Sequence, residues 1–137
     1  MQTFLPYNDF PKSAASLDMR RLGKQRVEAY QILRSLLGIS NGWINHPATK
    51  MWCGHEMTLY IYTRDICNEW INRGYKDTIK EKIQTQLFDM IPESTTPKWL
   101  GNEDFHRSHR ANLVAKNKDF YAPQFGDLPF EPYVWPV

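Results

Sequence analysis

The sequence predicts an all-α fold: a single compact bundle of about four helices with extended N- and C-terminal arms. Apolar residues recur at helical spacing in four segments, and no segment shows the alternation between hairpin turns that strands require. The length of 137 residues suits one domain with a real core, and 42% hydrophobic and 23% charged residues are ordinary for a globular protein. We therefore expect residues 1–137 to form one helical domain.

The first two elements follow from prolines, aromatics and caps. Residues 1–15 hold two prolines among three aromatic residues, which indicates an ordered, extended arm. A first helix is expected over residues 17–37, since Ser16 or Asp18 can cap its start and Gly38 can end it.

Three further helices are expected after a loop that contains Asn41-Gly42 and Pro47. The second runs from about Ala48 or Gly54 to Arg73, where Gly74 can end it. The third covers about 78–90 and the fourth about 104–118. Residues 121–137 contain four prolines, so no helix is expected there, and this tail should lie extended across the bundle.

The sequence also indicates the cellular compartment of the protein. No run of 18 apolar residues and no signal peptide is evident, so we expect a cytoplasmic protein without a membrane partner. Cys53 and Cys67 lie fourteen residues apart on one predicted helix. That separation is roughly 21 Å of helix rise, so free thiols in a reducing compartment are expected.

The first helix carries the strongest functional signal. Four basic residues precede one acid, Glu28: Arg20, Arg21, Lys24 and Arg26. Helical spacing places Arg20, Lys24 and Glu28 along one stripe, with Arg21 and Gln25 beside it. A solvated face with local ion pairs is the plain alternative. Few acids are nearby, however, and arginine suits bidentate contacts with phosphate, so we favour recognition of an anion next to a carboxylate.

Two other clusters contain histidines. The predicted fourth helix presents His106, Arg107, His109 and Arg110, and His109 is as readily an interior histidine as a functional one. Metal binding by the two histidines with Asp104 lacks a recognisable ligand pattern, and we expect neither a metal nor a cofactor. His46 precedes a proline on a loop, where it either binds a ligand or caps the next helix.

Other signals are weaker or missing. Tail aromatics are expected to pack against the bundle rather than to stack on bases, namely Tyr121, Phe125, Tyr133 and Trp135. The phosphate-binding loop GxxxxGK[ST], the GxGxxG fingerprint, the GxSxG elbow and the CxxC pair are all absent from the sequence. P-loop hydrolysis and serine hydrolase chemistry are therefore unsupported.

Several segments together resemble phage pyrimidine-dimer DNA glycosylases of the endonuclease V type. LDMRRLGKQRVEAYQIL resembles the first helix of that family, whose catalytic glutamate falls at Glu28, with Lys24, Gln25, Arg26 and Gln31 at its basic and polar positions. GHEMTLYIY and INRGYKDT resemble a later helix start and its RG…KDT segment, and RANLVAKNKDFYAPQFG resembles the family's C-terminal part.

The resemblance implies an all-α fold with an N-terminal segment threaded between helices, and a defined chemistry. In that family an N-terminal amine attacks the sugar C1′ of a damaged nucleotide, forms a Schiff base and allows β-elimination to cut the strand. The glutamate stabilises the cationic sugar and assists proton transfer, while arginines hold phosphates.

The chain departs from the family at the nucleophile. The family uses a threonine exposed by removal of the initiator methionine, whereas residue 2 is Gln2, which should leave Met1 in place. Four possibilities follow: the Met1 amine attacks, Lys24 attacks if its pKa is lowered by Arg20, Arg21 and burial, water attacks, or the chemistry is lost and a binding pocket remains.

We expect a divergent DNA glycosylase-like enzyme that acts on DNA or a nucleotide. Its catalytic residues would be Glu28 with Lys24 or Met1. Phosphate and nucleotide contacts would come from basic and polar side chains, which are Arg20, Arg21, Gln25, Arg26, His46, His106, Arg107, His109 and Arg110. The alternatives are a non-catalytic binding protein that uses the same residues, in which Glu28 pairs with a lysine or arginine, and a helical module of a larger complex.

Overall fold

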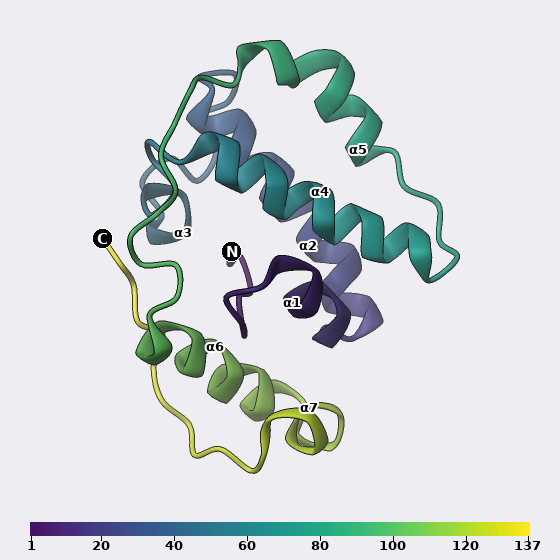
Figure 1. Ribbon diagram of the computed structural model, residues 1–137, viewed down its shortest axis with the longest axis vertical. Helices are drawn as coiled ribbons and strands as arrows, with labels where there is room; N and C mark the ends of the chain where they lie inside the picture. Colours follow the sequence, from purple (N-terminus) through teal and green to yellow (C-terminus); the bar gives the residue numbers. More distant parts are fainter.

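The computed structural model describes residues 1–137 and confirms the all-α prediction (Figure 1). Seven α-helices follow one another, and a π-helical turn and a 3-10 turn continue the fifth. In chain order they are α1 (Phe10–Ser16), α2 (Met19–Leu36), α3 (Pro47–Lys50), α4 (Glu56–Asn72), α5 (Ile79–Lys82), the π turn (Ile83–Leu87), the 3-10 turn (Phe88–Met90), α6 (Glu103–Lys116) and α7 (Lys118–Phe125). None of these helices has the length and apolar character needed to span a bilayer.

Helices α2 and α4 pack against each other through their apolar faces. The Asp18 side chain caps α2 by accepting from the backbone N–H of Arg21, and Leu22, Ile32 and Leu33 are buried. The contact is close at Gly23, because a Cβ there would meet the Trp70 ring at 2.9 Å. Glycine at this position therefore sets the spacing between the two helices.

The N-terminal segment is more helical than the sequence predicts. Residues 1–15 were expected to be extended, but α1 begins at Phe10. The Asp9 side chain caps this helix by accepting from the Lys12 N–H, and Pro11 lies in the first turn. An acidic cap followed by a proline in the first turn is a helix start signal, but the aromatic residues around it favoured an extended arm. The extended part is residues 1–9, which we call the arm.

The C-terminal expectation is also wrong in part. Residues 121–125 belong to α7, whose first turn is capped by Asn117, although Pro123 lies inside it. In so short a helix the missing N–H of proline removes one intrahelical bond, while Tyr121 is fully buried. Residues 126–137 are extended, as expected.

The middle of the chain differs at the helix boundaries. Of the two starts expected for the second helix, the one near Gly54 agrees with α4, while the residues from Ala48 belong to the separate helix α3; Gly54, in the turn between them, has φ +82°. The expected third helix is α-helical only at Ile79–Lys82. Cys53 is exposed in the turn and Cys67 is buried in α4, and both are free. They therefore do not share one helix, although the free thiols were predicted.

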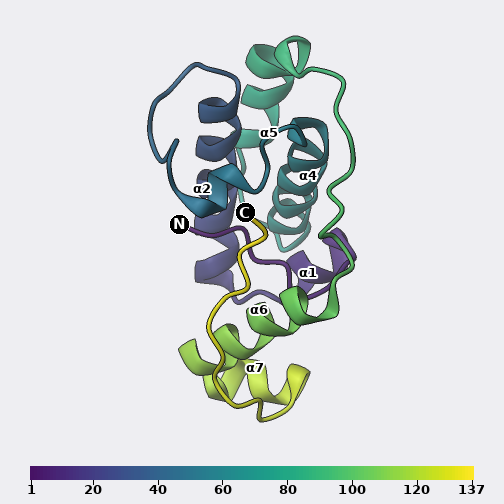
Figure 2. The same cartoon turned by 90° about the vertical axis from the view of Figure 1, so that its left-hand side faces the viewer.

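The helices form two groups with the arm between them. In both views α2, α4 and α5 lie toward one end of the molecule and α6 and α7 toward the other, while the arm and α1 lie between (Figures 1 and 2). Leu5 of the arm is completely buried with Tyr62 of α4 and Phe105 of α6 in one hydrophobic cluster. The first residues of the chain are thus part of the core.

Candidate active-site cleft

Side chains of α2 and α4 hold the arm by its backbone. The Gln25 side chain accepts from the N–H of Phe4 and donates to the carbonyl oxygen of Gln2 at 2.6 Å. The Tyr62 hydroxyl donates to the Phe4 carbonyl at 2.8 Å. These bonds fix the arm relative to α2 without dependence on the arm's own side chains.

Side chains of α6 hold the next two residues of the arm from the opposite side. The Leu5 N–H donates to His109 Nδ1 at 2.9 Å. His106 Nε2 accepts from the Gly101 N–H, so its Nδ1 carries the proton and donates to the Leu5 carbonyl at 2.7 Å. Arg110 donates to the Pro6 carbonyl at 2.8 Å. Burial lowers the pKa of His109 to about 3, which keeps the ring neutral and able to accept.

The N-terminal end of the arm lies beside Glu28. The backbone N–H of Gln2 donates to Glu28 Oε2 at 3.0 Å, and Met1 lies at the edge of a cleft of about 820 Å³. The cleft is bounded by the arm, α2, the junction of α6 with α7, and the C-terminal tail. Its lining residues are Met1, Gln2, Phe4, Asp18, Arg20, Arg21, Lys24, Gln25, Glu28, Lys116, Asn117 and Tyr133.

The cleft carries more positive than negative charge. Arg21 pairs with Asp18 at 3.1 Å, and Lys24 Nζ lies 3.5 Å from Glu28 Oε1. Arg20 and Lys116 line the cleft without an ion pair. Unpaired cations that face a polar hollow suit an anionic ligand.

His46 lies close to the cleft and also has a structural role. Its Nδ1 accepts from the Ala48 N–H at 3.0 Å, so it caps α3, which is one of the two roles expected for it. Burial lowers its pKa, the positive Met1 amine lowers it further, and the negative Glu28 opposes the shift. The ring therefore lies within electrostatic reach of both groups.

Arg26 points away from the cleft, although its expected role was phosphate contact. Its guanidinium pairs with the buried carboxylate of Asp77 at 2.6 Å and lies over the Trp70 ring at 4.4 Å. Arg26 follows Lys24 by two residues, which is a rotation of about 200° around the helix axis. The two side chains therefore face different surroundings. Arg26 instead holds α2 to the segment after α4.

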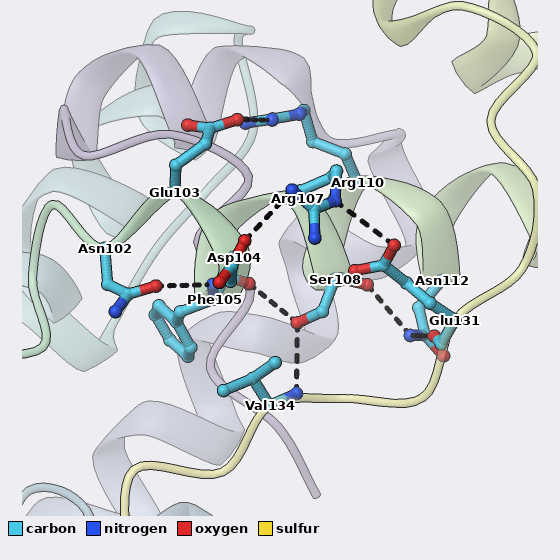
Figure 3. Close-up of polar contacts among 10 residues, drawn as sticks. All are labelled: Asn102, Glu103, Asp104, Phe105, Arg107, Ser108, Arg110, Asn112, Glu131 and Val134. Atoms are coloured by element: carbon cyan, nitrogen blue, oxygen red, sulfur yellow. Dashed lines mark hydrogen bonds and ion pairs between the residues drawn. The ribbon is translucent and has the colours of Figure 1, made fainter.

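The histidine motif of α6 does not line the cleft either. His106 and His109 are buried against the arm, and Arg110 bonds to the arm and to Glu103. Arg107 lies on the outer face of α6 between Asp104 at 3.1 Å and Glu131 at 3.2 Å (Figure 3). This placement corrects the expectation that the four residues share one site with α2.

The C-terminal tail supplies a cleft residue that was predicted only to pack. Ser108 and Asn112 of α6 bond to the backbone of Val134 and Glu131 in the tail (Figure 3), which positions Tyr133 at the cleft. Burial raises the pKa of the Tyr133 phenol to about 12, so the phenol stays protonated and can donate. Lys116 and Asn117 also line the cleft, and no sequence signal marked them.

Fold and site together define a helical protein whose N-terminal arm ends at a carboxylate inside a basic cleft. The family model for pyrimidine dimer DNA glycosylases matches residues 1–82, the segment that contains the arm, α2 and Glu28. The match covers more than half of the chain, and the protein belongs to this family. No curated protein and no solved structure matches the chain.

Membership supports a DNA glycosylase-like function in DNA repair, with DNA as the substrate class. Helices α6 and α7 lie outside the matched residues. The cleft is therefore assembled from family-matched residues and from Lys116, Asn117 and Tyr133 beyond them.

Proposed function

We propose that this protein is a divergent DNA glycosylase-like enzyme that breaks the N-glycosidic bond of a damaged or modified nucleotide, with Glu28 as the catalytic carboxylate. The single observation that carries the proposal is the contact between Glu28 and the backbone of Gln2 inside a basic cleft. Departure of the base builds positive charge on the sugar, and a fixed carboxylate lowers that barrier electrostatically.

The amine of Met1 is the nucleophile that the geometry supports best. Met1 lines the cleft, and the next residue bonds to Glu28. In the proposed step the amine nitrogen bonds to C1′ and loses a proton, while the base leaves with the bonding electron pair and takes up a proton. Opening of the sugar ring then gives a Schiff base, from which β-elimination can cut the strand.

Lys24 is less well suited to the same role. The hypothesis for Lys24 required burial, but its side chain is 77% exposed and its ammonium pairs with Glu28. Attack by water remains the route to base release without a covalent adduct. Arg20 and Lys116, which line the same cleft as Glu28 and form no ion pair, are the proposed phosphate contacts.

The test is incubation with duplex DNA that carries ultraviolet dimers, abasic sites or modified bases, with and without borohydride. Glu28→Gln keeps the size of the side chain and an acceptor for the Gln2 N–H, so folding should be unchanged. We expect turnover to fall at least about 100-fold. Glu81→Gln is the matched control, because Glu81 is exposed on α5 and forms no ion pair.

A covalent adduct trapped by borohydride would identify the nucleophile. Mass spectrometry of the adducted peptide should place the added sugar on Met1, and an adduct on Lys24 would overturn that part of the proposal. Base release without an adduct would indicate water. A Glu28→Gln protein with full activity would refute the assignment of the carboxylate.

A non-catalytic nucleotide or nucleic-acid binding protein is the second candidate. The ion pair between Lys24 and Glu28 is the contact that this alternative predicts. A binder returns its ligand unchanged after denaturation, whereas an enzyme converts it. Because the lysine is exposed, the pair is weak and easily displaced, so it does not prevent Glu28 from acting on a bound nucleotide.

A further inference from the structure

The loop after α2 contains an unusual tryptophan. Trp43 is the only residue other than glycine with a positive φ, at 62°, and its side chain is 52% exposed. A bulky residue in this region is a backbone outlier, and such conformations concentrate at ligand sites. An exposed indole on a strained backbone is therefore better explained by ligand binding than by packing in the protein.

The loop is attached firmly to α2. Ser35 of α2 donates to the Gly42 carbonyl, and the Ile39 N–H donates to the Arg34 carbonyl at 3.0 Å. The His46 N–H donates to the Trp43 carbonyl at 3.0 Å. Trp43 is thus presented by a hydrogen-bonded loop, which limits the entropy lost when a ligand binds.

A series of aromatic rings connects Trp43 to the cleft. The Trp43 and His46 ring centroids are 5.8 Å apart, and His46 lies 5.8 Å from Trp135. Trp135 in turn lies 5.5 Å from Tyr133, which lines the cleft. The loop and the cleft are therefore neighbouring parts of one surface.

A second hollow of about 220 Å³ lies beside Trp43. Its other lining residues include Gln31 and Arg34, which continue the stripe of α2 that carries Arg20, Lys24 and Glu28. Arg34 forms no ion pair, and its guanidinium lies over the Tyr30 ring at 5.7 Å. An aromatic ring beside a free arginine matches one nucleotide, which presents a base and a phosphate.

We propose that this second hollow binds the nucleotide adjacent to the target nucleotide on the same DNA strand, with Trp43 stacked on its base and Arg34 at its phosphate. The inference rests on the proposed function only in taking the cleft as the target site. Continuity along α2 and the positive charge of both hollows favour a nucleic-acid strand over an apolar protein partner.

The test uses an oligonucleotide with a tetrahydrofuran abasic analogue flanked by 2-aminopurine, as a single strand and in a duplex. Trp43→Gly tolerates the positive φ and removes the ring, whereas Trp43→Phe keeps a stacking surface. Phe130→Ala is the matched control, because Phe130 is a 68% exposed aromatic on the tail that lines neither hollow. Affinity is measured by anisotropy, and stacking by 2-aminopurine emission.

We expect Trp43→Gly to weaken binding by about 5- to 150-fold, the range for loss of one base–aromatic stack. Quenching of the neighbouring 2-aminopurine should disappear, and Trp43→Phe should restore most of both effects. Phe130→Ala should match the wild-type protein. Thermal unfolding should show Trp43→Gly to be folded, so that the loss reports binding.

Wild-type affinity and quenching in Trp43→Gly would overturn the inference, as would equal losses in Trp43→Phe and Trp43→Gly. Self-association that Trp43→Gly abolishes without any effect on DNA would show that a second copy occupies the hollow, and would also overturn it. Failure of the proposed function is distinguishable, because a fully active Glu28→Gln protein leaves these binding results unchanged.

Discussion

Two clusters of basic side chains have opposite surroundings in this protein. Arg20, Arg21 and Lys24 on α2 border an open cleft, whereas His106 and His109 on α6 are buried against the arm. The difference arises because backbone groups of the arm bond to the side chains of His106 and His109, whereas the arm bonds on α2 go to Gln25 and Glu28 and not to the three cations. Arg20 has no ion pair, and Arg21 and Lys24 pair only with acids that line the same cleft, so this cluster is the better candidate for binding an external anion.

The largest expected effect is on the α6 cluster. His109→Ala removes the acceptor for the buried Leu5 N–H and leaves a cavity, so the free energy of unfolding should fall by roughly 2–5 kcal/mol. Urea denaturation measures this change, and His109→Asn, which can retain an acceptor near the Nδ1 position, should lose less. His55→Ala is the control at a histidine outside the arm contacts. Wild-type stability of His109→Ala would contradict the structural role of the cluster.

Acid should destabilise the protein through the same histidine. The folded pKa of about 3 lies below the ordinary 6.5, so between these values the unfolded chain binds a proton that the folded chain does not. Stability should therefore fall as the pH drops from 6.5 toward 3, by up to about 1.4 kcal/mol per pH unit. Urea denaturation at successive pH values should show a shallower dependence for His109→Asn. An equal slope in both proteins would exclude His109 as the cause.

The cleft cluster should respond in binding and not in stability. Arg20→Ala removes an exposed, unpaired cation, so unfolding should change by less than about 0.5 kcal/mol. DNA affinity should fall about 5- to 10-fold, and the slope of log affinity against log salt should decrease by about 1. Arg64→Ala, which removes the same charge from α4, should leave the slope unchanged. An unaltered slope for Arg20→Ala would remove Arg20 from the phosphate contacts.

The smallest effect is expected at Arg107. Its two ion pairs are on the surface and its side chain is 42% exposed, so Arg107→Ala should change stability least among these variants. DNA affinity should match the wild-type protein in the same anisotropy assay. A loss as large as that of Arg20→Ala would show that the outer face of α6 also contacts DNA.

Periodicity and caps predicted most of the helical framework. Helical spacing, a capping residue at Ser16 or Asp18 and Gly38 predicted α2 to within two residues at each end. Helices α1 and α7 were not predicted, because the aromatic residues and prolines of these segments indicate an extended chain, whereas Asp9 and Asn117 cap a short helix in each. Both helices are short, and their burial depends on distant partners such as the contact between Tyr121 and Asp18.

Helical spacing also predicted part of the site, and long-range contacts decided the rest. Arg20, Lys24 and Glu28 do share the cleft-facing stripe. The roles of His106 and His109 depend on Leu5, more than one hundred residues earlier in the chain, and spacing within one helix carries no information about that contact. Arg26 faces Asp77, which lies 51 residues further on.

The arm is attached through its backbone, so its length determines where the N-terminal amine lies. Hydrogen bonds hold the main chain at Gln2, Phe4, Leu5 and Pro6, so the number of residues before these points sets the position of the first amine. One additional residue lengthens an extended chain by about 3.3 Å, which is more than the separation between Gln2 N and Glu28. Insertion of a single residue between Met1 and Gln2 would therefore alter the cleft as directly as a substitution at Glu28.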